Sequence, residues 1–212
     1  MMASTLGLGS SLIMVELLPD SASGIGEVFD GANKLFLLLG YMIMGIIIIK
    51  MCDIFIPDHE LKKDNKKNHY LHLALIISLP IMIYNLIVGM KINMSSNPFM
   101  LGFGLGFCNI LFSLLLSGLF SKSLSKKNLI ITIILLSLSP IIGNLFHIFL
   151  NHYLNISTSL MVIISTINLG MIIYIILGEL FLNLLKYKDT YITILGIIFG
   201  TILLFISHLF YL

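Results

Sequence analysis

The sequence predicts an all-α, polytopic membrane protein of about seven transmembrane helices. Of the 212 residues, 58% are hydrophobic and only 10% are charged, whereas a soluble domain usually has about 25% charged residues. The apolar residues form seven long runs separated by short charged or turn-rich breaks, and the lysines gather in alternate breaks. We therefore expect one transmembrane domain, residues 1–212, with the lipid bilayer as its surroundings.

Most of the expected helices are apolar runs with the roughly 20 residues needed to cross a bilayer. The first run is short, because only 18 residues precede Pro19. It begins without the basic stretch of a cleavable signal peptide. Charged residues or Asn, Ser and Pro close each of the following runs. The expected spans are 2–18, 33–56, 70–92, 98–121, 128–151, 158–185 and 190–212.

The lysines predict the orientation of these spans. Ten of the twelve lysines lie on one side, in or beside alternate breaks, and only Lys34 and Lys91 lie on the other. By the positive-inside rule, the loops 57–70, 121–128 and 186–190 are cytoplasmic. The N-terminus is then expected inside and the C-terminus outside.

The 57–70 loop is the basic cytoplasmic loop between the second and third spans. His59, His69 and His72 lie in or beside it. A solvated basic loop near anionic lipid head groups explains these histidines as well as a weak metal site does.

An internal repeat is also readable. "LGLGSSLIMVEL" (6–17) and "LGMIIYIILGEL" (169–180) share Leu-Gly, a Glu nine residues after the Gly, and a final Leu. The spans that follow share "LGYMIMG" (39–45) and "LGIIFG" (195–200). Because five spans separate the copies, they must face opposite ways. Inverted repeats are typical of transporters, although glycine-spaced apolar helices also look alike by chance.

Several segments resemble the ZIP (Zrt/Irt-like) family of metal transporters. "MASTLGLGSSLIMVELLPDS" is similar to the second helix of the family, and "LLLGYMIMGIIIIKMCDIFIPDHEL" to its third. "INLGMIIYIILGELF" resembles the seventh helix and "ILGIIFGTILLFISH" the eighth. The resemblance implies a ZIP-like helix bundle lacking the first of eight helices. It also implies a divalent metal ion, Zn²⁺ or Fe²⁺, as the transported species, and a homodimer as a candidate assembly.

The metal centre that the resemblance implies is degenerate in this chain. The family's fourth helix carries His-Asn-x-Pro-Glu-Gly, in which imidazole and carboxylate suit Zn²⁺. The matching segment is "YNLIVG", where Tyr84, Ile87 and Val88 occupy the His, Pro and Glu positions. Only Asn85 and Gly89 are kept. Without charged ligands, tight Zn²⁺ binding here is not expected.

The fifth helix of the family shows the same loss of charge. In "GFCNILFS" (106–113), Asn109 occupies the position of a metal-facing glutamate. Four spans carry one asparagine each, and these amides either line a neutral path or form interhelical hydrogen bonds worth about 0.6 kcal/mol. The candidate path residues are Tyr84, Asn85, Val88, Asn109, Asn144, Asn168 and Glu179.

Three further residues are candidate metal ligands. Glu16 and Glu179 occupy matching positions of the repeat, and a carboxylate within a membrane is a functional candidate by default. His147 lies near the outer end of its span, with Asn151 and His152 following. The alternative is that all three mark the membrane interface, where water reaches them.

Two functions remain open from the sequence. The first is a ZIP-like divalent metal transporter of the plasma membrane, and the second is a non-transporting relative that acts as a partner, sensor or regulator. No Ser-His-Asp, Cys-His or paired-carboxylate pattern appears, so neither an enzyme nor a nucleic-acid-binding protein is expected. Cys52 and Cys108 lie far apart in apolar segments and are interpreted as buried packing residues.

Overall fold

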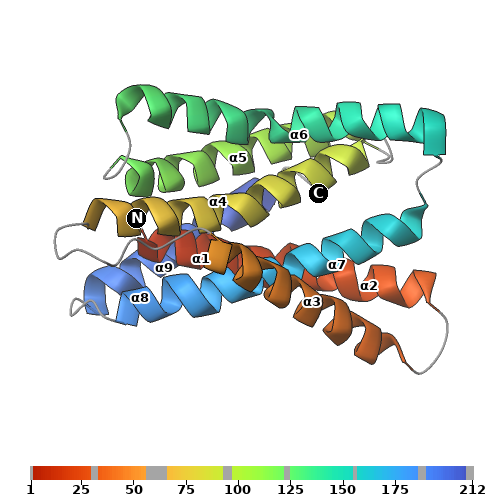
Figure 1. The fold of residues 1–212 in the computed structure, drawn as a ribbon, viewed down its shortest axis with the longest axis horizontal. Helices are drawn as coiled ribbons and strands as arrows, with labels where there is room; N and C mark the ends of the chain where they lie inside the picture. The colour runs from red at the N-terminus through yellow and green to blue at the C-terminus, as the bar shows by residue number, and fades with distance from the viewer. Residues whose placement is uncertain are drawn as a thin grey trace.

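The computed structural model of the chain describes residues 2–29, 33–55, 66–92, 97–121, 125–154, 157–185 and 190–208. Within these ranges the chain is all-helical and contains no strand. The helices run back and forth along the long axis of one bundle (Figure 1). In chain order they are α1 (Met2–Leu12), the π-helix η1 (Ile13–Leu17), α2 (Leu18–Val28), α3 (Lys34–Phe55), α4 (Lys66–Lys91), α5 (Pro98–Phe120), α6 (Lys126–Leu154), α7 (Thr158–Tyr174), the π-helix η3 (Ile175–Phe181), α8 (Leu182–Leu185) and α9 (Thr190–His208).

We call each traverse of the bundle by the chain a pass. The first pass is longer than the expected span 2–18. α1, η1 and α2 form one continuous helix from Met2 to Val28, so the expected break at Pro19 is wrong. The N–H of Leu18 bonds to the carbonyl of Ile13, five residues back, as in a π turn. Pro19 follows at the start of α2.

Helices also occupy the other six expected spans. α3 to α9 lie at the predicted positions, and η3 continues α7 without a break. Most of the 57–70 loop lies outside the described residues, since α4 begins at Lys66.

The outer faces of several helices are apolar. Among the described residues, three helices are long and apolar enough to cross a membrane by length and composition: Lys34–Phe55, Lys126–Tyr153 and Thr158–Phe181. Large hydrophobic side chains point outward along α3, α6 and α9, including Phe36, Ile47, Ile134, Leu145, Ile198 and Phe199. Apolar patches of this extent are rare on soluble monomers.

Three helix pairs build the interior. α1 packs along α9, α3 along α7, and α4 along α6 (Figure 1). These pairs join the first pass to the seventh, the second to the sixth and the third to the fifth. Because consecutive passes run in opposite directions, the two members of each pair run in the same direction.

Glycines allow the first pair to cross with its backbones in contact. A Cβ added to Gly7 would collide with the carbonyl of Ile197, and one added to Gly200 would collide with the carbonyl of Ser4. Each glycine thus packs against a backbone carbonyl of the other helix, and this carbonyl belongs to the residue three positions before the glycine of that helix. Small residues at crossings permit this close approach.

The α3/α7 crossing has the same geometry. A Cβ on Gly170 would meet the carbonyl of Met42, and one on Gly45 would meet the carbonyl of Ile167. The two crossings therefore correspond residue by residue. α1 matches α7 and α3 matches α9, and the difference in residue number is constant within each matched pair of helices. The matched positions are 4 with 167, 7 with 170, 42 with 197 and 45 with 200.

The α4/α6 crossing follows the same rule. A Cβ on Gly89 would collide with the carbonyl of Pro140, and one on Gly143 would collide with the carbonyl of Leu86. Gly89, which the motif comparison singled out, is therefore a packing residue in this fold. Its crossing fixes α4 against α6 and leaves the rest of α4 facing α3, α5, α7 and η3.

Candidate functional site

The side chain of Tyr84 links α4 to the first pass. Its hydroxyl donates a hydrogen bond of 2.5 Å to Oε1 of Glu16, and Tyr84 is 2% exposed. Glu16 belongs to η1, where the π-helical turn bulges from the regular helix. Such turns are frequent at functional sites. The phenol therefore holds a carboxylate inside the bundle.

The next residue on α4 links that helix to α5. The amide Nδ2 of Asn85 donates to Oδ1 of Asn109, and both residues are buried. Val88, one turn further along α4, is also buried and belongs to the apolar core. Asn85 and Asn109, both predicted path residues, therefore touch directly and have the interhelical hydrogen bond that the alternative interpretation requires.

Two hydrogen-bonded pairs, Tyr84–Glu16 and Asn85–Asn109, start from adjacent residues of α4, and we call these four residues the central polar cluster. The cluster contains one carboxylate, one phenol and two amides, and its oxygen atoms suit hard cations better than soft ones. Among the described residues, no three His, Cys, Asp or Glu side chains converge as a metal-binding group. A cation at this cluster would depend on Glu16 for its charge balance.

The two other predicted amides, Asn168 and Asn144, lie on α7 and α6. Asn168 on α7 is 1% exposed, and neither of its amide atoms has a hydrogen-bond partner among the described residues. Leaving a buried polar group unpaired costs about 1–3 kcal/mol. Asn144 on α6 is half-buried and lines a cleft of about 450 Å³ between α5 and α6, together with Asn109.

Glu179 lies in η3, at the position that corresponds to Glu16 in η1. It is half-buried and close enough to Tyr174 for its charge to act on the phenol. The two candidate glutamates thus both lie in π-helical turns. Glu16 accepts its hydrogen bond from Tyr84 of α4.

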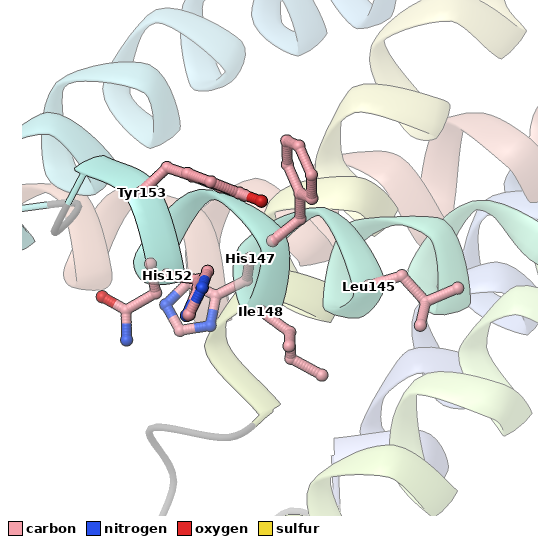
Figure 2. Close-up of a pocket in the computed structure, with 7 residues that line it drawn as sticks. Leu145, His147, Ile148, His152 and Tyr153 are labelled. Carbon is pink, nitrogen blue, oxygen red and sulfur yellow. The ribbon is translucent and has the colours of Figure 1, made fainter.

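His147 lies near the end of α6, in a shallow surface hollow. The hollow has a volume of about 810 Å³, and its described lining comes from this one helix. Figure 2 shows His147, Ile148 and His152 projecting from the last turns of α6. His147 is buried and His152 is exposed. Two imidazoles on one helix are fewer ligands than a closed metal site needs.

The sequence interpretation missed one group of polar side chains. Asp53, near the end of α3, accepts a hydrogen bond of 3.3 Å from the hydroxyl of Tyr174 on α7, and its other oxygen lies 2.9 Å from Nε2 of His72 on α4. We call Asp53, His72 and Tyr174 the end cluster. The available signal was an acidic residue within an apolar segment, which is a functional candidate in any membrane helix.

An ion pair joins α4 to α2. Nζ of Lys91 lies 3.7 Å from Oδ2 of Asp20, and both side chains are partly exposed. Together with the two clusters, this pair places polar contacts along the length of α4.

Comparison with known proteins adds no assignment. No family model matches the chain, and neither a curated protein nor a solved structure matches it.

Proposed function

We propose that the protein is an integral membrane transporter of ZIP-like architecture that moves divalent metal cations, zinc or iron, across the plasma membrane. In this proposal the bundle crosses the bilayer seven times. The N-terminus lies inside and the C-terminus outside, because the lysines concentrate in alternate loops. The outward apolar faces of α3, α6 and α9 support a lipid environment.

The observation that carries the proposal is the correspondence between the two halves. The α1/α9 and α3/α7 crossings match residue by residue, and each half places a glutamate in a π-helical turn. This supports the inverted repeat expected from the sequence. In transporters, inverted repeats enclose a site near the middle of the membrane, between the halves.

The central polar cluster is the site that this arrangement favours. It lies where α4 contacts both η1 and α5, and α4 and α5 have no counterpart in the sequence repeat. Glu16 supplies the only formal charge of the cluster, and Tyr84, Asn85 and Asn109 supply neutral oxygens. A cation held by one carboxylate and several neutral groups is bound weakly enough to leave again, as transport requires.

Metal uptake into proteoliposomes tests the proposal. We expect Glu16→Gln to abolish uptake of Zn²⁺ or Fe²⁺, because the amide removes the charge but keeps an oxygen that Tyr84 can donate to. The matched control is Glu27→Gln, at an exposed position of α2, which should transport like the wild type. Equal uptake by the two variants, or unchanged uptake after joint replacement of Asn85 and Asn109 by alanine, would reject this path.

The mutual pairing of Asn85 and Asn109 favours a second candidate function. Each amide satisfies part of the other's hydrogen bonding, so the pair is stable without a ligand. In this alternative the protein is a non-transporting ZIP-like relative that acts as a membrane partner, sensor or regulator. It requires that calorimetry find no Zn²⁺ or Fe²⁺ binding that depends on the central polar cluster.

A further inference from the structure

The cleft between α5 and α6 has the size and the opening of a ligand site. Its volume of about 450 Å³ lies in the range of roughly 300–1,000 Å³ that small-molecule sites have in proteins. Ile110 of α5 and Ile141 of α6 line the cleft, and these residues are 58% and 56% exposed. The cleft therefore opens on the apolar outer surface of the bundle. In the seven-span arrangement, a ligand enters it from the lipid.

Two glycines of α5 keep the cleft open. Gly102 and Gly106 line it, and a Cβ added to either would meet no described atom within 4 Å. The glycines of the three helix crossings, by contrast, lie against a backbone carbonyl of the neighbouring helix. The space beside Gly102 and Gly106 is therefore a feature of this cleft, and it is not shared by every glycine of the bundle.

A buried amide with spare donors lies in the lining. Asn109 lines the cleft and is 4% exposed. Its Oδ1 accepts the hydrogen bond from Asn85, and within the described residues the side chain of Asn109 makes this one hydrogen bond. The NH₂ group, with two donor hydrogens, is left over. Because buried donors are almost always paired in proteins, this group indicates an acceptor inside the cleft.

The lining also limits the charge of that ligand. Ser137 and Asn144 of α6 supply the other polar side chains, and the described lining contains no charged residue. An ionised group buried without a partner is strongly disfavoured, so the ligand is neutral. A carbonyl oxygen is a neutral acceptor with two lone pairs. The apolar part of the lining, such as Leu105 and Ile110, then covers an apolar body.

The depth of Asn109 distinguishes a free ligand from the surrounding lipid. Asn109 lies halfway between Pro98 and Phe120, the ends of α5, which is about 16 Å from either end at 1.5 Å per residue. In a membrane-spanning α5, its amide lies near the middle of the bilayer. The ester carbonyls of bilayer lipids lie at the edges of a hydrocarbon core about 30 Å thick, so they stay out of reach of Asn109.

We propose that the α5/α6 cleft binds a neutral, lipid-soluble carbonyl compound that is free in the membrane, with Asn109 donating to the carbonyl oxygen. Its effect on transport rests on the proposed function. Since Asn109 also accepts from Asn85, the bound compound holds one side of the central polar cluster in place and slows uptake. Binding itself does not depend on transport.

Nuclear magnetic resonance tests the site on the full chain, labelled with ¹⁵N-asparagine, in nanodiscs of ether-linked phospholipids, which have no ester carbonyl. The side-chain signal of Asn109 is identified by its loss in Asn109→Gln. We expect 2-hexadecanone to shift this signal and the matched alkane, hexadecane, to leave it in place. A signal that neither compound moves, or that both move equally, would overturn the recognition of a carbonyl.

A second set of nanodiscs tests the source of the carbonyl. We expect the Asn109 signal to be the same in ester-linked and ether-linked phospholipids when no ketone is added. A shift caused by ester-linked lipid alone would assign the cleft to the bulk lipid and reject a free ligand.

Gly106→Leu tests whether the cleft holds the compound. The added side chain fills the open space, so the affinity for 2-hexadecanone should fall at least about 10-fold. The matched control is Gly40→Leu on α3, where an added Cβ also meets no described atom within 4 Å but the residue does not line the cleft. Both side chains enter open space, so both variants should fold. Equal affinities in the two variants would reject the cleft as the site.

These measurements separate the proposal from the proposed function. Because they detect binding and not uptake, a chain that moves no Zn²⁺ still supports the site when the ketone shifts the Asn109 signal. If the chain does transport, 2-hexadecanone should slow Zn²⁺ uptake by the wild type and not by Gly106→Leu. Slowing to the same extent in both would reject the link between the cleft and the transport path.

Discussion

α4 contacts its neighbours in two contrasting ways. Toward α6, Gly89 and Gly143 bring the two backbones together with no side chain between them. Toward η1, α5 and α3, by contrast, the contacts are hydrogen bonds between side chains, made by Tyr84, Asn85 and His72. Where two helix backbones touch, neither helix can shift without a clash, because the interior is close-packed. Side-chain bonds can be exchanged for bonds to water or a ligand, so the adjustable contacts of α4 are its polar ones.

Filling a backbone crossing should have the largest effect on stability. Gly89→Leu would drive its side chain into the carbonyl of Pro140, and we expect a loss of about 3 kcal/mol or more in the free energy of unfolding. The matched control is Gly102→Leu on α5, where an added Cβ meets no described atom within 4 Å. Thermal unfolding in detergent measures both variants. Equal destabilisation by the two would remove the distinction between the crossing and the open glycine.

Removing the donor to Glu16 should have the next largest effect. Tyr84→Phe leaves the carboxylate without its 2.5 Å hydrogen bond, and bonds to charged groups contribute about 1.5–3 kcal/mol. The control is Tyr153→Phe, because Tyr153 is 67% exposed and its hydroxyl is reached by solvent. If both variants unfold at the wild-type temperature, the polar contact contributes nothing to the fold.

The Asn85–Asn109 contact should be weaker. We expect a double-mutant cycle with Asn85→Ala and Asn109→Ala to give a coupling free energy of about 0.6 kcal/mol, and not above about 1.7 kcal/mol. The amides can find other partners when one is removed, which limits the coupling. Unfolding of the two single variants and the double variant supplies the cycle, and strictly additive effects would show that the two side chains act independently.

The smallest effect is expected at the Asp20–Lys91 pair. The charged atoms are 3.7 Å apart and both side chains are partly exposed, so Asp20→Asn should cost less than about 1 kcal/mol. High salt should weaken the contribution of the pair in the wild type and leave the variant unchanged. A loss comparable to that of Tyr84→Phe would place this pair among the buried contacts.

The passes of the bundle follow directly from the sequence, but one helix end does not. Apolar runs bounded by charged breaks predict the positions of α3 to α9, because long uninterrupted apolar runs favour helices. The end of the first pass was predicted wrongly, because proline is read as a helix boundary. The π turn before Pro19 is a property of backbone hydrogen bonding that no residue pattern reveals.

Only part of the candidate site could be predicted from the sequence. Asn85 and Asn109 were found as amides in apolar helices, but their direct contact joins residues of two different helices and needs the fold. Asp53 was missed because an acidic residue near the end of a span resembles an interfacial one. Its significance depends on His72 and Tyr174, which come from two other helices.

The paired π-helical turns also bear on ancestry. A π turn holds an extra residue compared with the α-helical turn it replaces, and inserting one residue into a helix is a route by which such a turn can arise. η1 and η3 lie at matching places and each contains a glutamate. If the two halves descend from one duplicated segment, a single insertion before the duplication accounts for both turns. The acidic turn would then be older than the two-fold bundle, and the ancestral peptide would have carried it in both members of a dimer.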